Sequence, residues 1–205
     1  FCRIVLAIDK FRRNLKGSLL QAGFALAAAF AFATVVYLLG NVAIGSGHTL
    51  LEDHLFADDP DAGFRNVAAR VLGSLTSVSA GGAGGIFAPS LASGAAIGGW
   101  LTDALGLADN RGQFNLLVLA GMTAFLSGVT RSPFTSAILV LEMTDRHSVI
   151  FQLMYAGMVG NLIATLIDKK PYYERMKERW LRIVGAPVTP RDKTEEGEGG
   201  GFGLG

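Results

Sequence analysis

Long stretches without a charged side chain divide the sequence, and their length predicts helices that cross a membrane. Residues 18–44 contain no Asp, Glu, Lys or Arg and are rich in Ala, Phe and Leu, and residues 148–167 are equally free of charge. A helix needs about 20 apolar residues to cross the hydrocarbon core of a bilayer. We therefore predict a spanning helix in each stretch, and a further apolar helix at residues 114–129.

A fourth charge-free stretch, residues 71–102, has a different pattern. Glycine, serine and threonine are frequent in its first half, and Pro89 interrupts the apolar run. The pattern predicts a helix over 67–79, a glycine break at 81–85 and a second helix over 87–105. Non-helical backbone survives at membrane depth only where it is buried in protein or lines a watery cavity. The break therefore predicts a transport pathway.

The remaining segments are shorter or more polar. Pro133 at the first helical position and Ser132 as its N-cap favour a short helix over 133–143. The other predictions are the end of an earlier helix over 1–13, a short acidic segment over 48–63 that cannot span a membrane, a basic helix over 172–184, and a disordered cytoplasmic tail over 185–205.

Composition agrees with a membrane protein. Half of the 205 residues are hydrophobic and 17% are charged, whereas soluble domains carry about a quarter charged residues. The net charge of +1 gives no reason to expect nucleic acid as a partner, and Cys2, the single cysteine, excludes an intramolecular disulfide framework. Because the sequence starts without a leader, we expect residue 1 to be an internal position of a longer protein. Basic clusters at 10–16 and 169–182 place the adjoining helix ends, and the C-terminus, in the cytoplasm.

The second helix of the broken pair is a candidate anion site. Its first N–H groups lack partners within the helix, and the peptide dipoles place about half a positive charge at that end. Gly84 and Gly85 leave no side chain between backbone and ion, and Pro89 lies in the first turn, where it removes no needed donor. A second interpretation is that Ser90, Gly94 and Gly98, spaced by four, serve only close helix packing.

Three motifs in order resemble the CLC family of chloride channels and chloride/proton antiporters. The run Gly-Gly-Ile-Phe-Ala-Pro-Ser-Leu-Ala-Ser-Gly-Ala at 84–95 resembles the family's Gly-x-Phe-x-Pro signature. A second matching block runs from Gly121 to Asp145, and Lys170-Pro171-Tyr172-Tyr173 resembles the family's Lys-Pro-x-Tyr. The resemblance covers residues 1–184, which would be the second of two inverted halves of an all-α, polytopic membrane domain with broken and tilted helices.

The resemblance implies chloride, or a similar small anion, as the transported ion, with protons as a second partner in antiporters. Ile86 and Phe87 would supply main-chain amides and Tyr173 a hydroxyl, while Gly84, Gly85, Ala88 and Pro89 would line the pathway. Ser46 lies in a Gly-Ser-Gly that lacks the family's following Ile-Pro, so we do not count it as a ligand. The glutamates that separate channel from antiporter would lie in the first half. A homodimer through 133–143 and 148–167, in a cell or inner membrane, is also implied.

Other residues give weaker indications. For Glu142 a hydrogen-bonding role is favoured over a proton relay, and for Arg131 a solvated loop position over anion steering. The histidines share no metal-ligand spacing, and no residue stands in a catalytic pattern, so we expect no metal, no cofactor and no enzyme. The alternatives are another broken-helix transporter, for a carboxylate, and a membrane-embedded or nucleotide-binding enzyme. A fragment that does not function alone is a third.

Overall fold

The computed structural model describes residues 2–14, 17–57, 62–79, 85–145, 147–168, 173–177 and 181. The chain divides into two units, Phe1–Lys169 and Lys170–Gly205. Regular structure in the described residues is helical throughout, which confirms the predicted all-α class. The elements, all in the first unit, are α1 (Cys2–Asn14), α2 (Ser18–Leu39), η1 (Asn41–Ala43), α3 (His48–Phe56), α4 (Phe64–Ser79), α5 (Phe87–Ala104), α6 (Arg111–Thr130), α7 (Pro133–Thr144), η2 (His147–Val149) and α8 (Ile150–Ile167).

Three helices of the described chain are long and apolar enough to cross a membrane. They are α2, α6 and α8, which contain the three apolar segments predicted from the sequence. α2 has a single buried residue, Ala28, and its apolar side chains are exposed along its length. Such a helix is stable only where lipid or other apolar protein covers it.

The first spanning helix is shorter than predicted. It ends at Leu39 because Gly40 adopts a φ of 89° and its N–H donates to the carbonyl of Val36 at 2.8 Å. Glycine takes this left-handed conformation without the penalty that a Cβ imposes, and it commonly ends helices. The apolar residues that follow, up to Ile44, form a 3₁₀ turn and a loop, so hydrophobicity alone did not mark the helix end.

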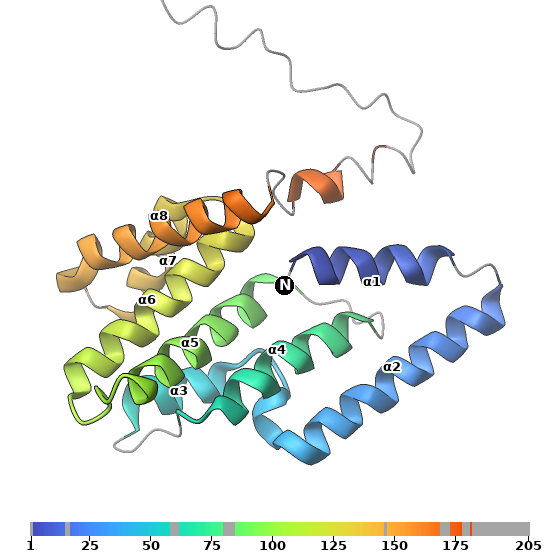
Figure 1. Cartoon of the computed structure of the whole chain (residues 1–205), viewed down its shortest axis with the longest axis horizontal. Helices are drawn as coiled ribbons and strands as arrows, with labels where there is room; N and C mark the ends of the chain where they lie inside the picture. Colours follow the sequence, from blue (N-terminus) through green and yellow to red (C-terminus); the bar gives the residue numbers. More distant parts are fainter. Residues whose placement is uncertain are drawn as a thin grey trace, which may run out of the picture. The chain divides into compact units, whose positions relative to one another are not determined.

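Small residues bring α5 and α6 into backbone contact. A Cβ added to Gly94 would lie 2.5 Å from the carbonyl oxygen of Gly121, and one added to Gly98 would lie 2.3 Å from the carbonyl oxygen of Leu117. The predicted packing role of the four-residue spacing is therefore confirmed. Figure 1 shows α6 running alongside α5 on one side and α8 on the other. The core between them includes Phe114, Val118 and Met122.

Arg131 joins the end of α6 to the end of α8. Its backbone is left-handed, with a φ of 63°. Its guanidinium donates to the carbonyls of Asn161 at 3.1 Å, Ala164 at 2.6 Å and Asp168 at 2.6 Å. These acceptors lie in the last two turns and at the C-cap of α8, where the helix dipole favours a cation. The solvated role expected for Arg131 is wrong, because the tertiary fold brings these carbonyls to it.

An asparagine side chain and a proline mark the starts of α6 and α7. α6 starts at Arg111 because the side chain of Asn110 accepts from the N–H groups of Gly112 at 3.1 Å and Gln113 at 3.3 Å. Pro133 does begin α7 and Ser132 holds the N-cap position, but the Ser132 side chain makes no capping hydrogen bond. The sequence therefore predicted where α7 begins, but not whether the Ser132 hydroxyl caps it.

Replacement of Gly98 by alanine is expected to destabilise the complete protein by about 1–3 kcal/mol, because the added methyl meets backbone atoms that cannot rotate away. Thermal unfolding in detergent measures the effect. Gly23→Ala is the matched control, since no atom lies within 4 Å of a Cβ built on Gly23. Equal melting temperatures for the two variants would contradict the close α5–α6 approach.

Candidate functional site

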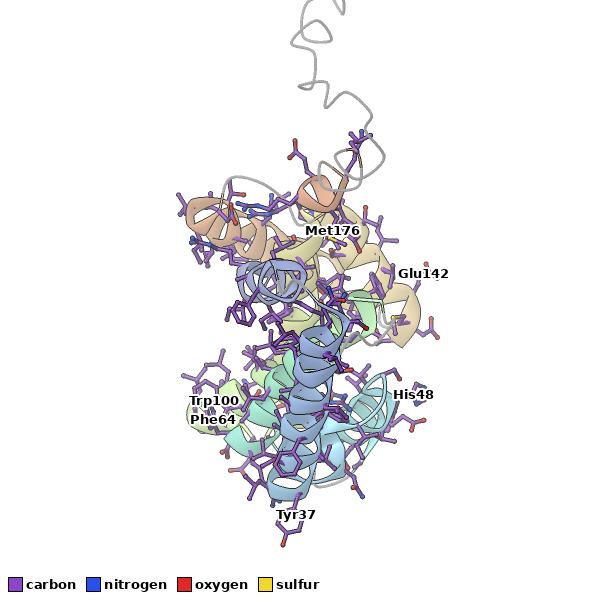
Figure 2. All side chains as sticks on the ribbon, turned by 90° about the vertical axis from the view of Figure 1, so that its right-hand side faces the viewer. Tyr37, His48, Phe64, Trp100, Glu142 and Met176 are labelled. Carbon is purple, nitrogen blue, oxygen red and sulfur yellow. The ribbon has the colours of Figure 1, made fainter. Side chains whose placement is uncertain are left out.

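The break between α4 and α5 lies at adjacent ends of two antiparallel helices. α4 ends at Ser79 and α5 begins at Phe87, which confirms the two predicted helices and the interruption between them. The rings of Phe64 and Trp100 meet edge to face, with centroids 5.7 Å apart, and hold the far ends together (Figure 2). Gly84 and most of the predicted glycine break lie outside the described residues.

The first turn of α5 has free backbone donors. Ile86 occupies the N-cap position, where its side chain cannot accept a hydrogen bond, and the N–H of Ser90 makes the first helical bond, to the Ile86 carbonyl at 3.1 Å. Pro89 has no N–H. The N–H groups of Phe87 and Ala88 therefore have no acceptor among the described residues. This is the condition that the predicted anion site requires, since such groups carry the positive end of the helix dipole.

A cleft of about 320 Å³ opens at this helix end. Four residues of the predicted motif region line it: Gly85, Ile86, Ala88 and Pro89. The opposite walls are Phe32 of α2, Ala43, Gly45 and Ser46 of the segment between α2 and α3, and Gly73, Ser74, Ser77 and Val78 of α4. Because one water in the liquid takes about 30 Å³, the cleft has room for a small ion with part of its hydration shell.

Hydroxyl groups face the backbone donors across the cleft. Ser74 donates to the carbonyl of Arg70 at 2.7 Å, in the i−4 position typical of serine in a helix. Ser77 and Ser46 have no hydrogen-bond partner among the described residues and are exposed, so both are available to an ion or its waters. Ser74 and Ser77 were not predicted from the sequence. Their spacing of three residues does indicate that both hydroxyls lie on one face of a helix.

The cleft wall is uncharged and mostly apolar, with a few polar groups. Every described residue that lines it is neutral, and the polar groups are serine hydroxyls and main-chain N–H and C=O groups. Neutral donors hold an anion without the deep trap that a contacting cation would create, which suits a species that must leave again. Ser46, which was not counted as a ligand from its sequence motif, lies on this wall because η1 and the following loop fold back against α4.

Two other residues were singled out in the sequence. Tyr173 belongs to the second unit, in the helical stretch 173–177, and is half exposed, so its role as an anion ligand stays a prediction. Glu142 on α7 is exposed and points away from the helices in Figure 2. Its carboxylate has no hydrogen-bond partner among the described residues, and the hydrogen-bonding role expected for Glu142 stays a prediction.

A comparison of the sequence with protein-family models identifies the family of this chain. The model described as voltage gated chloride channel matches residues 1–165, which include α1 to α7, most of α8 and the whole cleft. The match agrees with the helical architecture and with the three apolar spans. It assigns the chain to membrane transport of anions, with chloride as the transported ion. This chain belongs to the CLC family of voltage-gated chloride channels, as an integral membrane protein.

Proposed function

We propose that this chain forms one half of a chloride pathway and that the cleft at the start of α5 is the place where it holds the ion. The observation that carries the proposal is the unpartnered N–H group of Ala88, which lines a neutral cleft, together with that of its neighbour Phe87. Anion binding at such helix ends follows from the dipole and the free donors together. The same device, an interrupted helix pointing at an anion, recurs in membrane transporters.

The proposed mechanism exchanges water for protein donors. As the anion enters, the first-turn N–H groups of α5 and the hydroxyls of Ser46 and Ser77 replace part of its hydration shell. The apolar groups beside them, from Phe32, Ala43 and Val78, keep the site narrow and poor in other donors. The chemistry serves a channel and a chloride/proton antiporter alike, and in our proposal the difference arises from acidic side chains contributed by the other half of the membrane domain.

Two further features complete the proposal. Tyr173 supplies a hydroxyl to the ion, as the family resemblance implies for the Lys-Pro-x-Tyr motif. A second copy of the protein packs on α7 and α8, whose outer faces carry exposed apolar side chains, including Phe134, Ile138, Phe151 and Tyr155. Such a face suits either lipid or close packing against another helix pair, and the second copy is our proposal.

The direct test uses the complete protein in lipid vesicles loaded with potassium chloride. We expect chloride efflux on addition of a potassium ionophore, and chloride binding that saturates in isothermal titration calorimetry. Absence of both from folded, reconstituted protein would overturn the proposed function. Proton movement accompanying chloride, recorded with a pH electrode, would identify the antiporter and its absence the channel.

Tyr173→Ala in the complete protein is expected to weaken chloride binding about tenfold or more, because hydrogen bonds to a charged partner are worth about 1.5–3 kcal/mol. Titration calorimetry measures the affinity, and size-exclusion chromatography checks that assembly is unchanged. Tyr37→Ala is the control, because Tyr37 is exposed at the end of α2 (Figure 2). An unchanged affinity for Tyr173→Ala would refute its role as a ligand.

Ala88→Phe is expected to reduce chloride efflux at least about tenfold, because the ring would occupy the cleft where the small alanine now leaves space. The control, Ala104→Phe, places the same ring on an exposed position of the last turn of α5. Efflux at the wild-type rate from the Ala88 variant would show that the ion does not pass this cleft.

A further inference from the structure

An arginine is buried behind the wall of the cleft. Arg70, on α4, is 2% exposed and is the largest fully buried side chain of the described residues. Its guanidinium reaches the segment between η1 and α3, donating from Nη1 to the carbonyl of Gly45 at 3.2 Å and from Nη2 to that of Ile44 at 3.4 Å. Gly45 itself lines the cleft. One layer of backbone therefore separates this cation from the space proposed for the ion.

No carboxylate of the described residues forms an ion pair with Arg70. The ion pairs formed by described residues near this segment are those of His48 with Glu52 and of His54 with Asp53, and neither includes Arg70. Its Nε atom is buried without a hydrogen-bond partner among the described residues. Arginine keeps its charge in proteins, and removing an unpaired charge from water is costly. Two carbonyl bonds offset only part of that cost, so a positive potential remains around the site.

The geometry around Gly47 places Arg70 near α5. A Cβ built on Gly47 would lie 2.2 Å from the Cβ of Ala92 and 3.1 Å from the guanidinium carbon of Arg70. Gly47 has a φ of 94°, so glycine is needed here both for its backbone conformation and for the space. Gly47 alone thus separates the guanidinium from Ala92, in the second turn of α5.

We propose that Arg70 sets the charge selectivity of the cleft, by supplying a full positive charge that acts on the anion through the field and not by contact. This inference rests on the proposed function and adds a residue to it. The two carbonyls that Arg70 binds are the negative ends of dipoles beside the cleft, and the charge of the guanidinium offsets their repulsion of an anion. The N–H end of α5 and the serine hydroxyls then supply the contacts to the ion.

The test compares two arginines of α4 in the complete protein. Arg70→Gln removes the buried charge, whereas Arg65→Gln removes an exposed one that makes a single bond, to the Leu38 carbonyl at 3.1 Å. We expect Arg70→Gln to weaken chloride binding about tenfold, the order of effect of one charge acting across about 10 Å of protein. Arg65→Gln is expected to stay within about twofold of wild type. Calorimetric titration with sodium chloride measures both.

A side chain at position 70 whose charge changes with pH distinguishes an electrostatic effect on chloride binding from an effect of altered packing. In Arg70→His the chloride affinity is expected to rise about tenfold more than in wild type between pH 8 and pH 5, as the imidazole becomes protonated. A pH profile parallel to that of wild type would overturn the inference, as would wild-type affinity in folded Arg70→Gln. If Arg70→Gln does not fold, the pH profile of Arg70→His decides. If the wild-type protein itself does not bind chloride, the proposed function is overturned instead.

Discussion

The structure depends on one constraint: in a membrane, each peptide N–H and C=O must find a partner within the protein or in a watery cavity. Continuous helices meet it everywhere except at their interruptions. Two interruptions meet here, one after Leu39 and one before Phe87, and both border the same cleft. The first leaves carbonyls, which Arg70 binds, and the second leaves N–H groups. In our proposal the free N–H groups of this second interruption are what attracts an anion to the cleft.

Donors attract an ion usefully only if they are held in place. α5 carries them, and α5 is fixed along its length by α6, where Gly94, Gly98 and Gly121 let the two backbones touch. Buried side chains such as Leu91 and Met122 fill the space around this crossing. Close packing of this kind resists small displacements, because interiors have little free volume. The helix pair is therefore a rigid support for a site made of backbone.

The cleft is lined by neutral groups, and the charged guanidinium of Arg70 lies behind one layer of backbone. Such a site suits an ion that must be released better than one that stays tightly bound. Direct contact with a guanidinium would bind chloride strongly and slow its release, whereas a remote charge lowers the energy of the whole cleft for any small anion. Local contacts then decide where the ion rests. In this view the serine hydroxyls and the α5 donors give position, and Arg70 gives the sign of the charge.

The sequence by itself determined the helical class, the membrane environment, the break before Phe87 and the donor-bearing turn with Pro89. These follow from local rules: charge-free length, glycine clusters and proline position act within one segment. Only the tertiary structure decided that Ser46 and Ser77 line one cleft with that turn and that Arg70 lies behind the cleft wall. The same holds for Arg131, which caps α8. The hydrogen bonds of Arg70 and Arg131 join residues 25 to 37 positions apart, and no local pattern states which distant segments will lie together. Gly40 shows the same limit at short range, since apolar residues continue beyond the point where its backbone ends the helix.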